Sequence, residues 1–72
     1  MLIVDGTSFE EDEAKRLIDL LLRDQAPEAL SAAAAIEIAL REDAEVVELS
    51  SAGQAAVVCV LETAWRTGAR VP

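Results

Sequence analysis

The shortness of the chain, combined with its lack of histidine, limits the ways in which it can be stabilised. Its 72 residues suffice for a single small domain, 1–72, whose core supplies about 3–5 kcal/mol of net stability at most. Natural chains of this size often add disulfides, a metal ion or a second subunit. Cys59 is the only cysteine and histidine is absent, which excludes an intrachain disulfide and the usual zinc sites. We therefore expect no metal or other cofactor, and we expect association with another subunit.

The charge balance narrows the range of partners. The chain has 14 acidic and 6 basic residues and a formal net charge of −8, whereas phosphate backbones and anionic membrane surfaces attract positive charge. No apolar run approaches the roughly 18 residues of a membrane-spanning helix, and no basic region precedes the first apolar run as it does in a signal peptide. The sequence predicts a cytoplasmic protein that binds neither nucleic acid nor membrane directly. Lys15 is its single lysine, and such a preference for arginine is typical of GC-rich bacterial or phage genomes.

The first helix is expected to begin soon after residue 6. Residues 2–4 are apolar and suit a brief strand or an extended arm, which ends at the turn-forming Asp5 and Gly6. The acidic residues 10–13 would face the positive end of the helix dipole. Two overlapping pairs have the capping-box spacing, in which a hydroxyl and a carboxylate each cover a free backbone N–H: Thr7 with Glu10, and Ser8 with Glu11.

This first helix has a wide apolar face. Apolar residues recur at the i, i+3, i+4, i+7 spacing of one helical face, and Leu20 and Leu22 widen that face to about half of the circumference. The polar strip that remains contains acid–base pairs four residues apart with the acid first, the favourable order on a solvated face. The apolar face consists of Ala14, Leu17, Ile18 and Leu21, and the polar strip of Asp12, Lys15, Arg16, Asp19 and Arg23.

A second helix is predicted for residues 27–42, with Pro27 at a first helical position that tolerates proline. Glu37 and Arg41 lie four residues apart on a largely apolar surface. Two interpretations of this pair remain open: an ion pair at an interface, where it fixes the register of a partner, or a surface pair worth about 0.5 kcal/mol or less. The apolar residues form two adjoining faces, Leu30, Ala33, Ala34 and Ile38 on one and Ala29, Ile36 and Leu40 on the other.

The last third of the chain is ambiguous. Residues 46–49 suit a short extended segment before a helix cap at Ser50 or Ser51. The valine-rich residues 55–62 fit either a strand that returns from 46–49 or a helix. Helical spacing accounts for them better, because neither alternate set of strand positions carries a charge from 55 to 61. This helix would stop near Gly68 and present one face formed by Val57, Val58, Leu61, Ala64 and Trp65.

Together these segments predict a mainly α fold, a three-helix-bundle-like small domain. Each helix is expected to have about 16 residues, within the usual range for globular proteins. A minor two-stranded β pair, formed by residues 2–4 and 46–49, is compatible with this fold.

The stretch LIVDGTS resembles the first motif of the haloacid dehalogenase phosphatases, in which an apolar strand delivers Asp, any residue, Asp, Gly and Thr. The match covers Asp5, Gly6 and Thr7, and Ile3 stands where that family carries its nucleophilic carboxylate. Without an attacking carboxylate there is no covalent route, so we interpret these residues as a turn between a strand and a helix.

The small, acidic and helical makeup is similar to that of acyl carrier proteins, which carry a phosphopantetheine on the serine of an Asp-Ser-Leu motif at a helix start. Here the corresponding stretch is ELSSAG, in which Leu49 precedes Ser50 and Ala52 follows Ser51. The competing interpretation of these serines is a helix N-cap.

The sequence offers little for catalysis, and we assign no catalytic, cofactor-binding or metal-binding residue. Cys59 has no neighbouring histidine or lysine to favour its thiolate, so it is predicted to be a small buried residue. Trp65 is predicted to be an anchor in the core or at an interface.

The sequence therefore predicts a small, acidic, non-enzymatic protein-interaction module. It would associate with itself, as a homodimer, or with another protein, and would act as an accessory or regulatory subunit. One alternative is an acidic inhibitor or antitoxin-like protein that masks a basic surface, and another is an acyl-carrier-like protein. The interface candidates are Leu20, Leu22, Leu30, Glu37, Ile38, Arg41 and Trp65.

Overall fold

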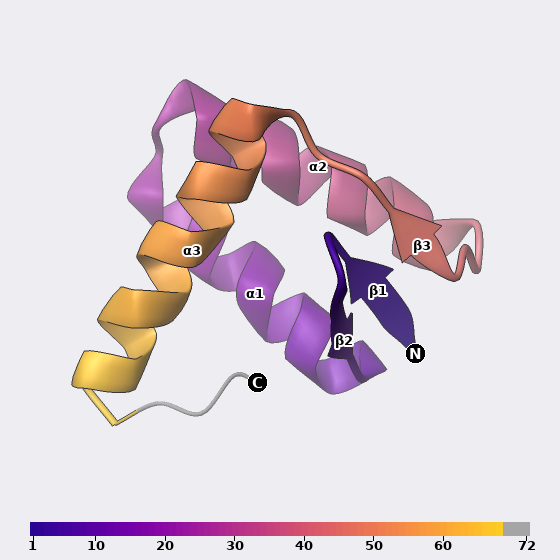
Figure 1. The fold of residues 1–72 in the computed structure, drawn as a ribbon, viewed down its shortest axis with the longest axis horizontal. Helices are drawn as coiled ribbons and strands as arrows, with labels where there is room; N and C mark the ends of the chain where they lie inside the picture. Colours follow the sequence, from indigo (N-terminus) through magenta and orange to yellow (C-terminus); the bar gives the residue numbers. More distant parts are fainter. Residues whose placement is uncertain (69–72) are drawn as a thin grey trace.

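Three helices make up most of the fold, and a small sheet lies near one end of the helix pair α1 and α2 (Figure 1). The computed structural model describes residues 1–68. Its elements are β1 (Leu2–Val4), β2 (Thr7–Phe9), α1 (Glu11–Asp24), α2 (Pro27–Arg41), β3 (Val46–Val47) and α3 (Ser51–Arg66). The predicted mainly α domain with a minor β part is confirmed, and residues 55–62 are helical.

The sheet has the strand order β2-β1-β3, so the first strand of the chain is its central one. β1 pairs with β3 in parallel, with Ile3 opposite Val46 and Val4 opposite Val47. The N–H of Ile3 donates to the carbonyl oxygen of Glu45 over 2.8 Å. The predicted pairing of residues 2–4 with the 46–49 segment is thus confirmed at residues 46 and 47.

The strand β2 was not predicted. Asp5 and Gly6 have φ values of +47° and +87°, and positive φ at both central residues is what a two-residue type I′ hairpin turn requires. Val4 and Thr7 consequently lie opposite each other in an antiparallel pair. Asp-Gly between two extended segments is a strong hairpin signal, so β2 could have been predicted from the sequence.

The predicted capping boxes at Thr7 and Ser8 are wrong, because both hydroxyl side chains belong to β2. The helix α1 begins at Glu11, and Glu10 is its N-cap. The N–H of Glu10 donates to Oε1 of Glu13 over 2.8 Å. The acidic run still occupies the first turn, where the helix dipole favours negative charge.

The hairpin turn is joined to the start of α3. Oδ1 of Asp5 accepts hydrogen bonds from the N–H of Leu49 (3.3 Å) and from Nε2 of Gln54 (3.2 Å). Nε2 of Gln54 also donates to the carbonyl oxygen of Leu49 over 3.1 Å. One carboxylate therefore holds the turn, the link after β3 and the first turn of α3 together.

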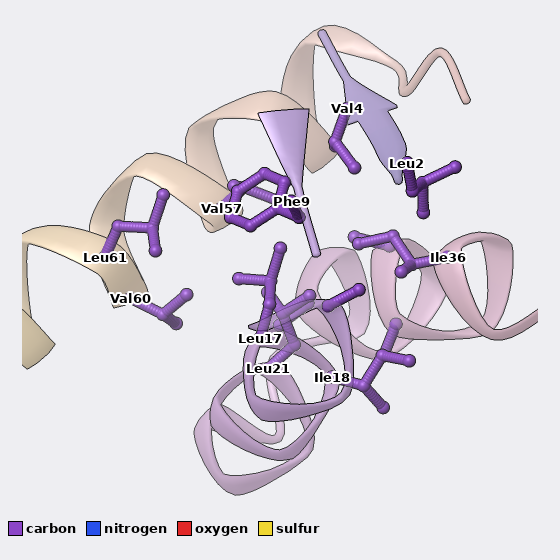
Figure 2. Close-up of a cluster of buried hydrophobic side chains, with 14 of the residues drawn as sticks. Leu2, Val4, Phe9, Leu17, Ile18, Leu21, Ile36, Val57, Val60 and Leu61 are labelled. Atoms are coloured by element: carbon purple, nitrogen blue, oxygen red, sulfur yellow. The ribbon is translucent and has the colours of Figure 1, made fainter. Parts of the chain in front are cut away.

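Phe9 is the largest of the fully buried side chains. It comes from β2 and lies within a cluster to which the strands and all three helices contribute (Figure 2). Leu2 and Val4 of β1 belong to the same cluster, because residues two apart in a strand point to the same face. The small sheet thus carries the one phenylalanine of the chain into the core.

The inner face of α2 consists mainly of alanine. Ile36 is the one large side chain that this helix buries, and Leu40 is half-buried. Of the face predicted from Leu30, Ala33, Ala34 and Ile38, only Ala33 is buried. Leu30 is 42% exposed and Ile38 is 52% exposed. The other buried residues of α2 are Ala29, Ala32 and Ala39.

The helix α3 is rotated relative to the prediction. Val58 and Trp65 are 53% and 51% exposed, whereas Val60 is buried in their place. A Cβ atom added at Gly53 would lie 3.2 Å from Cβ of Leu49 and 3.8 Å from Cβ of Ala32. The contact with Ala32 is ordinary van der Waals packing, and the tighter one is with Leu49, just before the helix. Because residues 55–61 are apolar all round the helix, the hydrophobic pattern does not decide which side faces inward.

Cys59 is exposed, so the prediction of a buried cysteine is wrong. The cause is the same rotation of α3, which turns residue 60 inward and residue 59 outward. Leu20, which was expected to widen the apolar face of α1, is half-buried and packs against the core.

Replacing Phe9 with alanine should lower the free energy of unfolding by about 3–5 kcal/mol, because it removes buried apolar surface and leaves a cavity in the packed core. In a domain of this size such a loss leaves much of the protein unfolded at 25 °C. Urea denaturation followed by circular dichroism measures the change, and Phe9→Leu, which keeps most of the apolar volume, should cost about 1.5 kcal/mol or less. A loss below about 1 kcal/mol for Phe9→Ala would contradict the central role of this side chain.

The link between the hairpin turn and α3 predicts a difference between two variants of Asp5. Asp5→Ala should lower the free energy of unfolding by about 1–3 kcal/mol, since it removes the acceptor for two hydrogen bonds and places alanine at positive φ. Asp5→Asn retains a carbonyl acceptor and tolerates positive φ, so it should cost less than about 1 kcal/mol. Equal losses for the two variants, measured by urea denaturation, would rule out this role.

Candidate functional site

A hollow on the described part of the chain lies between α1 and α2, and we call it the α1–α2 groove. Its volume is about 640 Å³. Residues four apart share a helix face, which places Lys15 and Asp19 of α1 on one wall and Glu37 and Arg41 of α2 on the other. The full lining consists of Glu11, Lys15, Ile18, Asp19, Glu37, Leu40 and Arg41.

Each wall of the α1–α2 groove carries its own ion pair. Nζ of Lys15 lies 3.2 Å from Oε1 of Glu11, and Nη2 of Arg41 lies 2.9 Å from Oε1 of Glu37. All four side chains are exposed, so solvent screens both pairs and each contributes little to stability. In the single chain, Glu37 and Arg41 therefore form an exposed surface pair.

Two smaller hollows continue the α1–α2 groove towards the sheet. The first, of about 130 Å³, shares Glu11 and Leu40 with the groove, and the second, of about 380 Å³, shares Met1, Asp43 and Ala44 with the first. The second hollow also reaches Ile3 and Glu45 at the junction of β1 and β3. Because neighbouring hollows share lining residues, we describe the three together as one depression, which is lined by both apolar side chains and carboxylates.

The charged side chains that line this depression are carboxylates and two cations, Lys15 and Arg41. Within residues 1–68, no three side chains from cysteine, aspartate and glutamate gather closely enough to hold a metal ion. The buried hydrophobic cluster contains no charged or polar side chain in the described part of the chain. The depression can therefore contact a polypeptide through apolar and ionic groups, but it does not present a convergent set of catalytic groups.

Among residues 1–68, the predicted interface candidates do not form one patch. Glu37 and Arg41 line the α1–α2 groove together. Of the remaining candidates, Leu20 is half-buried, and four are exposed on three different helices: Leu22 of α1, Leu30 and Ile38 of α2, and Trp65 of α3.

The helices α2 and α3 each carry a row of exposed residues along one face. On α2, Leu30, Ala34 and Ile38 are exposed and follow each other at intervals of four residues, and we call them the α2 ridge. On α3, the spacing i, i+3, i+7, i+10 places four exposed residues within an arc of about 80°. This second row, the α3 stripe, consists of Ala55, Val58, Glu62 and Trp65.

Sequence reasoning missed three exposed apolar residues: Met1, Val46 and Val58. Val58 had been placed on the inner face of its helix, whereas its side chain is exposed. Val46 could have been found from its position in a two-residue edge strand, since a residue of the sheet edge has one face towards solvent.

The residues that carried the two family resemblances have structural roles. Oγ of Ser50 accepts a hydrogen bond from the N–H of Gly53 over 3.1 Å, so Ser50 is the N-cap of α3. Oδ1 of Asp5 accepts hydrogen bonds from the N–H of Leu49 and from Nε2 of Gln54. Both side chains thus support the local fold at the start of α3.

None of the helices within residues 1–68 combines the length and the apolar character that crossing a membrane requires. Comparison with known proteins found no matching family model, no matching curated protein and no matching solved structure.

Proposed function

We propose that this chain is a small, acidic, non-enzymatic protein-interaction module of the cytoplasm. In this proposal it associates with itself, in the simplest case as a homodimer, and serves as an accessory or regulatory subunit. One observation carries the proposal, namely the distribution of large and small side chains around α2.

The helix α2 buries alanine at four positions and leaves Leu30 and Ile38 about half exposed. Burying the side chain of a leucine or isoleucine contributes about 1.5–3 kcal/mol relative to leaving it exposed. In a single chain about half of this contribution is unused at both positions, which are 42% and 52% exposed. A protein surface that covers Leu30 and Ile38 would recover it.

Isolated apolar residues on a surface are normal and by themselves indicate no partner. On α2 four of the five buried positions are alanine and only Ile36 is large, whereas Leu30 and Ile38 face outward. The alanines inside let α1 and α3 approach α2 closely, and the large aliphatic residues outside remain available for contact. This distribution supports the proposal that Leu30 and Ile38 belong to an interaction surface.

A second candidate function is an acidic inhibitor that masks a basic surface. The carboxylates at the rim of the depression beside the sheet favour it: Glu11 and Asp43 line one hollow, and Asp43 and Glu45 line the next. A target with arginine or lysine side chains could place them over this rim. Such a complex would depend on charge, whereas self-association through apolar residues would not.

Sedimentation velocity from about 1 μM to 1 mM tests the proposed function. We expect a reversible equilibrium between a 7.7 kDa monomer and a dimer, and we expect it to persist at about 0.5 M salt because apolar contacts are not screened. A dimer that dissociates steeply with salt would favour charge-led recognition. A monomer at every concentration would exclude self-association.

A further inference from the structure

We propose that the open edge of β3 binds an extended, basic segment of another protein, which adds to the sheet as a further strand. This inference goes beyond the proposed self-association, because the occupant is a different polypeptide on a different surface. The backbone of β3 requires an extended occupant, and the carboxylates around β3 select a basic one.

The strand β3 has backbone groups that face away from the rest of the sheet. The strand order β2-β1-β3 places β3 at a border, with no further strand beyond it within residues 1–68 (Figure 1). On the inner side of β3, the carbonyl oxygen of Glu45 accepts from the N–H of Ile3 over 2.8 Å. The carbonyl oxygen of Val47 accepts from the N–H of Asp5 over 3.4 Å. Since alternate residues of a strand direct their backbone groups to opposite sides, the N–H and C=O of Val46 point outward, where an added strand can pair with them.

The exposed rows on the helices do not offer this kind of contact. Within a helix the backbone N–H and C=O groups bond to one another, except at the helix ends. The α2 ridge and the α3 stripe therefore present side chains alone, which do not specify the conformation of a partner. An edge strand does specify it, because its donors and acceptors match an extended backbone.

An apolar surface lies beside the open edge. Ile3 is opposite both Ser8 and Val46, so these three side chains form a row across the sheet. The row lies on the face away from the core, because Leu2 and Val4 point into the core (Figure 2). Val46 is 55% exposed, and a hollow of about 380 Å³ is lined in part by Ile3. The row ends with the polar Ser8 at the β2 edge, so β3 is the edge that combines free backbone groups with an exposed apolar side chain.

The charge around β3 is complementary to a basic segment. Four exposed carboxylates lie within residues 42–48, and no lysine or arginine occurs from residue 42 to residue 65. Opposite charges that face each other across a strand pair are stabilising, and a basic residue next to the one that pairs with Val46 would lie across from Glu45. The four carboxylates are those of Glu42, Asp43, Glu45 and Glu48.

A second copy of this chain does not fit the same edge. It would bring its own carboxylates against those of the first copy, and two chains with a formal net charge of −8 repel each other. Short edge strands flanked by charge are a common protection against such pairing. The features that disfavour an acidic copy attract a basic strand, so the charge distinguishes the two occupants.

Titration with a synthetic peptide tests the inference. The probe is a capped peptide of about eight residues in which lysine and valine alternate, so that a valine pairs with Val46 and a lysine lies across from Glu45. We expect the largest NMR shifts at the amides of residues 45–48 and slower solvent exchange of the Val46 amide. The short edge predicts weak, reversible binding at low salt, with a dissociation constant of about 10 μM to 1 mM.

Two matched peptides separate strand addition from attraction between charges. The same peptide with methylated valine nitrogens keeps its charges and side chains but loses the donors opposite Val46, and it should bind at least about tenfold more weakly. A peptide with glutamate in place of lysine should not bind. Equal binding of the methylated peptide, or binding of the acidic one, overturns the inference.

Two double variants of the protein with the same net charge test the location. Glu45→Gln combined with Glu48→Gln removes the carboxylates that flank β3, and it should raise the dissociation constant of the peptide at least about fivefold. Glu28→Gln combined with Glu62→Gln removes two exposed carboxylates from α2 and α3, and it should raise that constant less than about twofold. Circular dichroism and urea denaturation establish that both variants are folded. Equal weakening by both would indicate diffuse attraction to the net charge and would overturn the assigned edge.

The outcomes are independent of the proposed self-association, which is measured by sedimentation velocity without peptide. Peptide-induced shifts confined to other parts of the chain, or no shifts at up to about 1 mM peptide, overturn strand addition at β3 and leave the homodimer untouched. A monomer at every concentration excludes the homodimer, whereas peptide binding at β3 would still support the inference.

Discussion

The close packing of α1 and α3 against the alanine-lined inner face of α2 is the constraint on which the rest of the structure depends. Gly53 of α3 lies beside Ala32 of α2, where an added Cβ would be in ordinary van der Waals contact with the alanine side chain at 3.8 Å. Small residues on both sides of a helix contact let the backbones come together, but they supply little apolar volume. Phe9 and the leucines of α1 make up for this deficit at the centre of the core.

The same constraint determines what the surface has to offer. Because the inner positions of α2 accept only small side chains, apart from Ile36, the larger aliphatic residues of that helix face solvent. The rotation of α3 has a similar consequence, since it exposes Val58 and Cys59. The exposed apolar residues of α2 and α3 thus follow from the internal packing.

Hydrophobic periodicity was sufficient to predict three helices and the pairing of the first strand with residues 46 and 47. It was not sufficient at Thr7 and Ser8, where the residue types suit a helix cap as well as a strand, and only the two-residue length of the Asp-Gly turn decides between them. It also failed for the orientation of α3, because a segment that is apolar all round has no preferred inner side. Of the site, the spacing of Glu37 and Arg41 was visible in the sequence, and so was the width of the apolar faces that include Leu22, Leu30 and Ile38. The α1–α2 groove depends on the separation of two helices, which the sequence does not give.

The central place of β1 in the sheet has a consequence for how the molecule forms. The N–H of Ile3 in β1 donates to the carbonyl oxygen of Glu45, next to β3. Two complete helices, α1 and α2, lie between these two residues in the sequence. During synthesis the N-terminal hairpin emerges from the ribosome early but keeps one strand edge open until residues 45–47 arrive. Such long-range pairing makes loop closure the slow event, and no shorter N-terminal piece can complete the native sheet.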